Sequence, residues 1–246
     1  MQCLWARSSG LTSAPVTALI TATGIGKSFN LRPVLREVSF SLAPGETVLL
    51  FGRNGCGKTT LLKIMAGIMR PERGQASLDR RELFTSDCRW RYDMIYLGHR
   101  PSLYSAFSAR ENLRLSLRLR RVGWDETSFQ NLLKRYGLSD REDEPVEVYS
   151  EGMLQRLGLI RLELSRWKLA LLDEPTSALD ADGASLLGET LARWRTAGRT
   201  VLFTSHDMLW GAEHADRALH LQRGRIASEL ASPTAPDLLA RLTGET

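Results

Sequence analysis

Hydrophobic residues follow two periods along the chain, and together these predict alternating strands and helices. Val38–Leu42 alternates apolar and polar residues, as a half-buried strand does. Continuous apolar runs predict buried strands at Thr47–Phe51 and Leu169–Leu172. Shorter or less uniform runs predict two more strands, at Met94–Gly98 and Thr200–Ser205. These segments predict the strands of a largely buried sheet.

The segments between these strands are mainly helical in pattern. Helices are predicted over Lys58–Ile68 and Asp182–Thr196. From about residue 105 to 166 the pattern is helical and poor in strands, which predicts an inserted helical subdomain, although the leucines of Arg114–Arg121 fit either a strand or a helix face. Strands that alternate with helices favour an α/β fold whose parallel strands place functional loops at their carboxyl ends.

The composition is that of an ordinary globular protein, and it serves mainly to exclude some classes of function. The 246 residues are 43% hydrophobic and 25% charged, and 33 basic against 28 acidic side chains give a formal net charge of +5. This charge is too diffuse to argue for DNA binding. We expect a single domain over residues 16–246 after a loose tail at 1–15 without a signal peptide. No apolar run approaches the roughly 18 residues of a membrane span, so another chain would supply any membrane part.

A glycine-rich loop joins the predicted strand at Thr47–Phe51 to the helix that follows it. Its sequence, GRNGCGKTT, has the spacing of a phosphate-binding P-loop in the strand–loop–helix context that this motif requires. Backbone N–H groups would surround a phosphate, with Lys58 neutralising the β- and γ-phosphate oxygens of ATP and Thr59 coordinating Mg²⁺. The predicted nucleotide-binding residues of the loop are Gly52, Arg53, Asn54, Gly55, Cys56, Gly57, Lys58, Thr59 and Thr60.

Acidic residues directly follow the predicted strand Leu169–Leu172. Because parallel strands end at the same edge of a sheet, Asp173 and Glu174 are expected near the P-loop. Asp173 would hold Mg²⁺ through water, and Glu174 would polarise the attacking water as the catalytic base. His206 ends the next predicted strand, where a contact with the γ-phosphate is favoured over an inert loop position.

The stretch VYSEGMLQRLGL, which begins at Val148, predicts a second anion-binding helix start. Ser150 is a suitable N-cap, and we expect Gly152 to leave open space over the first turn so that free N–H groups point outward. In isolation, an ordinary capped helix would explain this stretch better.

Together these motifs resemble the ATP-binding-cassette (ABC) ATPase subunits over residues 16–225. The resemblance implies a P-loop NTPase fold of the ABC type, with a mainly parallel core sheet, an antiparallel N-terminal β portion and the inserted helical subdomain. It makes YSEGMLQR the signature motif and places Asp180 in the D-loop. It also implies that Phe29 stacks on adenine and that His206 is the switch histidine, with a catalytic role beside Glu174.

In this family two cassettes associate head to tail, and each signature motif covers the nucleotide of the other cassette. The resemblance therefore implies that Ser150, Glu151, Gly152 and Met153 face ATP held by a second cassette, most simply a second copy of this chain. Glu151 and Met153 stand where glycine and glutamine are more usual. A carboxylate beside a triphosphate is unfavourable, so we expect Glu151 to point away from it.

A further departure lies at His99, twelve residues before Glu111, where many transporter cassettes have glutamine. A neutral imidazole there would replace the contact of glutamine with Mg²⁺ and the attacking water and make hydrolysis sensitive to pH. This interpretation is favoured over the alternative, an inert loop histidine. The stretch LGHRPSL narrows the resemblance to the ATPase subunits of haem exporters used in cytochrome c maturation. The S-x-G-M-x-Q-R pattern also occurs in ATPase subunits of drug and antibiotic exporters, which remain an alternative.

The resemblance implies a transporter motor bound at the cytoplasmic face of the inner or plasma membrane. Its partners would be a second cassette and a polytopic membrane subunit, docked on the loop His99–Ser105 and the helix from Ala109. A soluble cassette acting on nucleic acid or ribosomes is less favoured, because such proteins usually have two cassettes or a long coiled-coil insertion. Arg114, Arg118 and Arg121 fit a solvated helix face better than a nucleic-acid surface, so no nucleic-acid partner is expected. A small-molecule kinase would leave the signature stretch without a role.

Three cysteines, Cys3, Cys56 and Cys88, are scattered through the chain. Their number and spacing predict neither a disulfide framework nor a zinc site, so reduced thiols are expected. Cys56 lies in the P-loop beside Lys58 and a helix N-terminus, which favours some thiolate character. The alternative is a small residue that only fills space.

Overall fold

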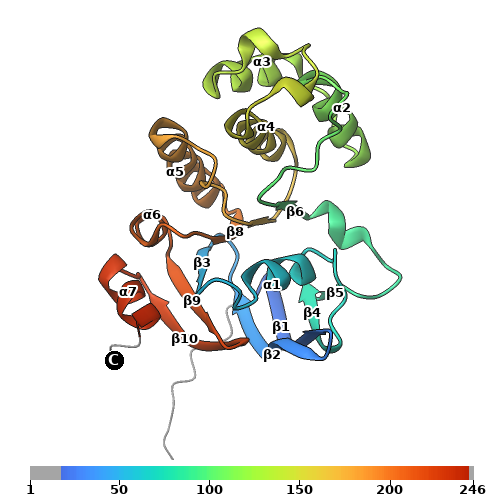
Figure 1. Ribbon diagram of the computed structural model, residues 1–246. Helices are drawn as coiled ribbons and strands as arrows, with labels where there is room; N and C mark the ends of the chain where they lie inside the picture. Colours follow the sequence, from blue (N-terminus) through green and yellow to red (C-terminus); the bar gives the residue numbers. More distant parts are fainter. Residues whose placement is uncertain (1–17, 244–246) are drawn as a thin grey trace, which may run out of the picture.

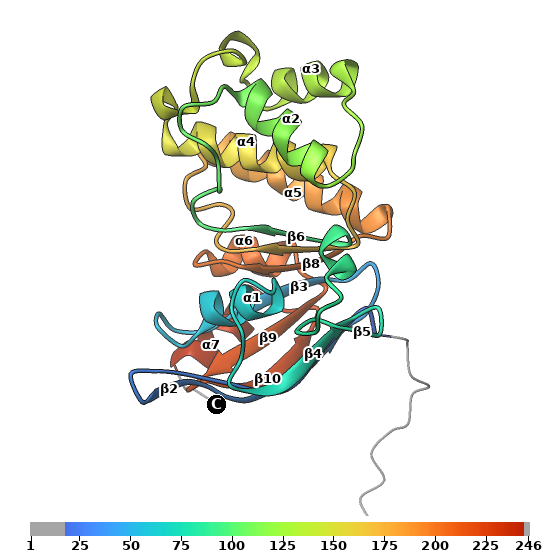
Figure 2. The ribbon, with the colours of Figure 1, turned by 90° about the vertical axis from the view of Figure 1, so that its right-hand side faces the viewer.

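Two sheets and a group of helices form the layers of the molecule, as Figure 1 and Figure 2 show. The computed structural model describes residues 18–243, so the predicted tail at 1–15 and Cys3 lie outside the described residues. The domain boundaries drawn from the sequence stay a prediction.

A six-stranded sheet forms the centre of the fold. Its strand order is β10-β9-β3-β8-β7-β6, and its neighbouring strands are parallel except for the antiparallel pair β9–β10 at one edge. The mainly parallel sheet predicted from the alternation of strands and helices is therefore confirmed. Its strands are β3 Thr47–Phe51, β6 Met94–Leu97, β7 Leu169–Leu172, β8 Thr200–Thr204, β9 Arg217–Gln222 and β10 Arg225–Ala231.

A smaller antiparallel sheet lies under the first, in the order β2-β1-β4-β5. The strand predicted at Val38–Leu42 is the second half of β2, because the pairing with β1 extends back to the turn at Asn30–Leu31. The expected antiparallel N-terminal portion is thus confirmed. Its strands are β1 Ile20–Phe29, β2 Arg32–Leu42, β4 Arg73–Leu78 and β5 Arg81–Glu82.

Helices cover both faces of the six-stranded sheet. In Figure 2, α1 lies between the two sheets, and α2, α3, α4 and α5 lie on the opposite side of the six-stranded sheet. The ambiguous segment Arg114–Arg121 is helical up to Leu119, because Ser108 and Glu111 form a capping box that starts the helix. The helices are α1 Lys58–Met65, α2 Ala109–Leu119, α3 Glu126–Arg135, α4 Glu151–Leu164, α5 Ala181–Thr196, α6 Met208–Glu213 and α7 Ala235–Thr243, with 3₁₀ turns at Arg89–Tyr92, Ser139–Arg141 and Val146–Val148.

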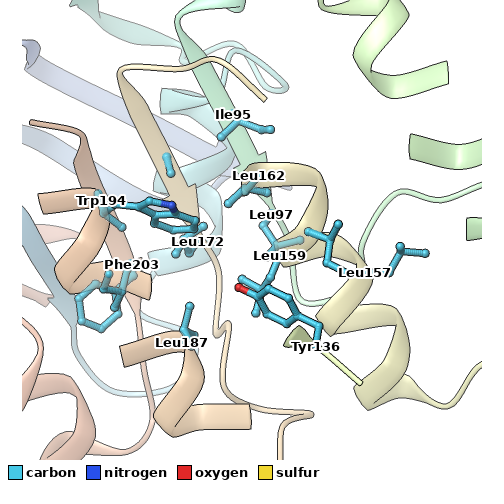
Figure 3. Packing of buried hydrophobic residues seen from close by; sticks show 14 of the residues in the cluster. Ile95, Leu97, Tyr136, Leu157, Leu159, Leu162, Leu172, Leu187, Trp194 and Phe203 are labelled. Carbon is cyan, nitrogen blue, oxygen red and sulfur yellow. The ribbon is translucent and has the colours of Figure 1, made fainter. Parts of the chain in front are cut away.

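Two hydrophobic clusters hold the layers together. One joins the six-stranded sheet to α2–α5 and includes Leu172, Phe203 and Trp194, as Figure 3 shows. The other joins the same sheet to α1 and the antiparallel sheet and includes Leu171 and Leu62. Successive residues of a strand point to opposite faces, so Leu171 and Leu172 belong to different clusters. Burial on both faces explains why these strands are continuously apolar in sequence.

A partly buried arginine ties the helical layer to the parallel sheet. Arg120 follows the last residue of α2, and its guanidinium donates to the carbonyl oxygens of Tyr92 at 2.9 Å, Met94 at 3.0 Å and Arg166 at 2.9 Å. These carbonyl groups lie around the start of β6 and shortly before β7, so one side chain fixes the end of α2 against both strands. Burial lowers the pKa of Arg120 from its ordinary value.

We expect Arg120→Met to lower the free energy of unfolding by about 2 kcal/mol, because several carbonyl groups lose a charged donor. Urea denaturation followed by circular dichroism measures this change. The exposed neighbour Arg118 provides the control, and Arg118→Met should change stability by less than about 0.5 kcal/mol. Equal stability of the two variants would contradict a stabilising role for the hydrogen bonds of Arg120.

Candidate nucleotide-binding and catalytic site

The glycine-rich loop forms a turn between β3 and the start of α1. Gly57 is the N-cap of α1 with a φ of 111°, and a Cβ atom there would lie 2.8 Å from a methyl group of Leu35 in β2. Glycine is therefore required for the loop to approach β2 this closely. Within residues 18–243 no side chain caps α1, so the N–H groups of its first turn remain available to a phosphate.

Lys58 places its ammonium group inside this loop. The residue is only 7% exposed, and its Nζ donates to the carbonyl oxygen of Gly52 at 2.8 Å and to that of Arg53 at 3.4 Å. A positive charge held at the centre of a loop with free N–H groups favours an anionic ligand. The loop predicted from the sequence therefore has the geometry that phosphate binding needs.

Two hollows lie beside the P-loop. One, of about 660 Å³, is lined in part by Gly52–Asn54 and His206. The other, of about 560 Å³, is lined in part by Thr59, His99 and the acidic pair Asp173–Glu174. The second hollow therefore brings together residues from three separate motifs: the P-loop, the stretch around His99 and the acidic pair.

Glu174 lies beside His206 in a strained main-chain conformation. Its φ is 54°, a region that costs a residue other than glycine about 1–3 kcal/mol. The Nε2 atom of His206 lies 2.5 Å from Oε1 of Glu174, so the two predicted catalytic side chains are in direct contact. Strain that the surrounding structure holds in place is typical of functional positions.

Two hydroxyl groups that the sequence analysis did not identify contact the acidic pair. Oγ1 of Thr204 donates to Oδ1 of Asp173 at 3.0 Å and accepts a hydrogen bond from the N–H of Glu174 at 2.8 Å. The hydroxyl of Tyr96 donates to Oδ2 of Asp173 at 3.4 Å, and burial together with the Asp173 charge raises the pKa of Tyr96. For Thr204 the sequence did offer a signal, because a polar residue ends an apolar strand at the edge of the sheet where the functional loops lie.

Hard oxygen ligands meet in the hollow beside Thr59 but form only part of a metal site. The side chain of Thr59 is exposed, and Asp173 lines the same space. Within residues 18–243 no three His, Cys, Asp or Glu side chains are arranged to hold a metal ion. Mg²⁺ commonly takes one or two protein ligands and completes its shell with substrate phosphates and water. The hydroxyl and carboxylate present therefore fit a magnesium ion that arrives with a nucleotide.

The signature helix α4 begins as its sequence predicts. Ser150 is the N-cap, and its Oγ accepts a hydrogen bond from the N–H of Met153 at 3.3 Å. The side chain of Glu151 is 76% exposed and lies 3.6 Å from the guanidinium of Arg100. The carboxylate is exposed and lies near a basic group, and its orientation toward a second nucleotide stays a prediction.

The expected open space at Gly152 is wrong. A Cβ atom at Gly152 would lie 2.8 Å from the carbonyl oxygen of Ala178, because the D-loop packs against the first turn of α4. Glycine at this position therefore permits contact between two segments of the same chain. A role toward a second nucleotide stays a prediction for this residue.

Polar contacts also join α4 to the D-loop. One guanidinium nitrogen of Arg156 donates to both carboxylate oxygens of Asp180 at 2.7 and 2.8 Å, and this arginine lowers the pKa of Asp180. Asp180 also caps α5 by accepting from the N–H of Gly183 at 2.9 Å. The buried Gln155 donates to the carbonyl oxygen of Pro175 at 3.1 Å. The signature helix and the loop that leaves Glu174 therefore form a connected unit.

His99 and Phe29 lie where contact with a nucleotide is possible, but their roles stay predictions. Nδ1 of His99 lies 3.0 Å from Oγ of Ser177, which leaves Nε2 for another partner in the hollow that His99 shares with Thr59. Phe29 is 43% exposed at the end of β1, and Nζ of Lys27 lies 5.6 Å from the centroid of its ring. The exposed ring is available for stacking.

The expected thiolate character of Cys56 is wrong. Burial raises the pKa of the Cys56 thiol above its ordinary value, although the charge of Lys58 acts in the opposite direction. This direction is opposite to the one that thiolate character requires, and the side chain is that of a small, partly buried residue. This outcome agrees with the alternative given above for Cys56.

Comparison with known proteins identifies the family. A family model described as ABC transporter matches residues 35–177. The cytochrome c biogenesis ATP-binding export protein CcmA of Methylococcus capsulatus is 38% identical over 178 residues, which cover 72% of this chain and 86% of that protein. The protein of the same name from Escherichia coli K12 is 34% identical over 196 residues, which cover 80% of this chain and 93% of that protein.

Within residues 18–243, no helix has both the length and the apolar character needed to cross a membrane.

Solved structures agree with this assignment. The structure of an ATP-binding subunit of an ABC transporter matches with a TM-score of 0.83 and 25% identity, covering 92% of this chain and 99% of that one. A dimeric ATP-binding cassette in a post-hydrolysis state bound to ADP and Pi has the same fold, with a TM-score of 0.80 and 22% identity over 87% of this chain and 99% of that one. The chain therefore belongs to the ABC transporter ATP-binding family and is a nucleotide-binding ATPase.

Proposed function

We propose that this chain is the ATP-hydrolysing motor subunit of an exporter that serves haem handling in cytochrome c biogenesis. The observation that carries this proposal is the similarity to cytochrome c biogenesis export proteins across 72–80% of the chain. His99 within LGHRPSL supports the same assignment, since the resemblance to haem-exporter ATPases rests on that stretch.

The chain's own residues would bind and orient ATP in the proposed cycle. Lys58 and the N–H groups at the start of α1 hold the phosphates, while Thr59 and Asp173 hold the Mg²⁺ that arrives with ATP. That ion, when bound, neutralises charge that develops on the phosphate. Glu174 accepts a proton from the attacking water, and His206 holds the Glu174 carboxylate and contacts the γ-phosphate.

A second cassette would complete the site. The N-terminus of α4, capped by Ser150, lies next to the D-loop, so both segments form one surface on this chain. In the proposed head-to-tail pair, this surface covers ATP held by the partner's P-loop. The dimeric cassette bound to ADP and Pi supports pairing of this kind.

An apolar hollow beside α2 is the proposed docking site for a membrane subunit at the cytoplasmic face of the membrane. It measures about 370 Å³ and lies between residues 102–104 and α2. Two side chains at its rim, Tyr104 and Leu119, are 60% and 67% exposed. Exposed apolar side chains around a hollow are typical of a surface that another protein covers.

One of the residues that line this docking hollow carries a positive charge, which restricts the kind of partner that can bind there. Arg161 lines it and donates to the carbonyl oxygen of Ser102 at 3.2 Å, but it forms no ion pair with any acidic side chain in the described part of the chain. Burial lowers the pKa of Arg161 to about 10. Arg161 is partly buried and also donates to the carbonyl oxygen of Tyr96 at 3.4 Å, and its charge has no acidic partner there, so the proposed docking element presents apolar side chains together with a carboxylate.

The proposed cargo is tested by deleting the gene in its host. We expect covalently haem-bound c-type cytochromes to disappear, as measured by haem staining of denaturing gels, because a maturation exporter without its motor cannot act. The wild-type gene should restore them, and a gene carrying Glu174→Gln should not. Normal c-type cytochromes combined with new sensitivity to a drug would favour a drug exporter instead.

Glu174→Gln should leave ATP binding intact and lower the rate of ATP hydrolysis by about 100-fold or more, because the amide cannot accept the proton of the attacking water. Calorimetry measures the binding, and release of phosphate measures the rate. Hydrolysis at the rate of the parent chain would refute the proposed role of Glu174.

Leu119→Asp should weaken retention of the membrane subunit about tenfold or more, because burying leucine contributes about 1.5–3 kcal/mol and a charge would now face the contact. Affinity purification of the tagged chain from solubilised membranes measures the retention. Leu31 is 98% exposed in the β1–β2 turn, far in sequence from α2, so Leu31→Asp is the matched control. Equal retention of both variants would contradict docking at this hollow.

A further inference from the structure

A row of polar side chains crosses three strands on the face of the sheet that α1 covers. Leu171 of β7 lies in the cluster around α1, and Asp173, two residues later, points to the same face. Thr204 occupies the equivalent place at the end of β8, because Leu172 pairs with Phe203. Tyr96 of β6 also packs against this cluster, and its hydroxyl reaches the Asp173 carboxylate.

Asp173 depends on these hydroxyl groups for its orientation. The residue is only 3% exposed, and among residues 18–243 it forms no ion pair. The side-chain contacts of its carboxylate are Thr204 on Oδ1 and Tyr96 on Oδ2. A buried carboxylate is unfavourable without hydrogen bonds or a cation, so these contacts hold it in place until a metal ion joins it.

Thr204 also acts on the neighbouring acidic residue. Its hydroxyl group donates a hydrogen bond to Asp173 and accepts one from the N–H of Glu174. One partner therefore fixes its role as a donor, and the other its role as an acceptor. The N–H of Glu174 belongs to a residue in the left-handed region, with a φ of 54°. The bond from Glu174 to Thr204 therefore helps to keep this unfavourable conformation.

We infer that Thr204 is a positioning residue, whose hydroxyl group sets the metal-binding carboxylate of Asp173 and the main chain of Glu174 relative to each other. Tyr96 supports the second oxygen of the same carboxylate through a longer, weaker contact. This inference rests on the proposed roles of Asp173 and Glu174 but is independent of the transported cargo. It predicts that loss of one hydroxyl group weakens metal binding while phosphate binding by the P-loop persists.

Thr204→Val and Thr204→Ser separate the hydroxyl group from the shape of the side chain. Valine keeps the branched shape without the hydroxyl, and serine keeps the hydroxyl. The full chain is loaded with the non-hydrolysable analogue AMP-PNP, whose affinity is measured by calorimetry in excess EDTA. In a separate sample without EDTA, Mn²⁺ binding to the AMP-PNP complex is followed by electron paramagnetic resonance. We expect Thr204→Val to weaken Mn²⁺ binding about tenfold, because partners of metal ligands typically contribute 10- to 100-fold.

The same measurements give the supporting and the opposing results. AMP-PNP affinity in EDTA should be unchanged in Thr204→Val, and Thr204→Ser should bind Mn²⁺ as the parent does. Parent-like Mn²⁺ binding by Thr204→Val would overturn the inference. An equal loss of AMP-PNP affinity in EDTA would also overturn it, since that result indicates general damage.

Two further variants serve as controls. Thr47 of β3 is 1% exposed, and its Oγ1 atom has no hydrogen-bond partner in the described part of the chain, so Thr47→Val should bind Mn²⁺ as the parent does. Asp173→Asn should lose Mn²⁺ binding. If Asp173→Asn binds Mn²⁺ normally, the proposed metal role of Asp173 fails as well. If only Thr204→Val is normal, the positioning role alone fails.

Discussion

Parallel pairing of β3, β8 and β7 is the constraint on which the site depends. Leu49 and Leu172 both pair with Phe203, so the three strands run in register and end at one edge. The P-loop, His206 and the acidic pair leave the sheet at that edge. The arrangement brings Lys58 and two carboxylates to one region, and the charges of triphosphate and magnesium can be balanced there. Main-chain hydrogen bonds between neighbouring strands hold this register, and burial on both faces shields those bonds from water.

The second level of organisation is the connection between the signature helix and the D-loop. In α4, Arg156 donates to Asp180 and Gln155 donates to Pro175. Gly152, in the first turn of the same helix, lies against the carbonyl oxygen of Ala178. Pro175 directly follows Glu174 in the chain. The segment that α4 contacts therefore begins one residue after the proposed catalytic base and continues into the D-loop. In the proposed head-to-tail pair, contact with a partner would act on the position of that base through this short segment.

The sequence allowed the sheet, the P-loop and the acidic pair to be predicted because each depends on local pattern. Apolar runs identify buried strands, and the P-loop spacing requires glycines at fixed places. The close contact at Gly152 was missed, and the two interpretations of Cys56 were left open, because both depend on packing between distant segments. Thr204 was missed for the same reason, since its role follows from the register of β7 and β8. Pairing partners across parallel strands are not visible in a single sequence.

One loop joins the apolar hollow beside α2 to the hollow lined by Thr59 and the acidic pair. Gly98 and His99 line the space that holds Thr59 and the acidic pair, and five residues later Tyr104 lines the apolar hollow beside α2. Ser102 lines both. His99 contacts Ser177 in the segment that leads from Glu174 to the D-loop. A protein that pressed on this loop would therefore act on side chains of the hollow lined by Thr59 through covalent connection, without a long path through the core. In the proposed transporter, this short connection would couple ATP hydrolysis to a membrane subunit docked beside α2.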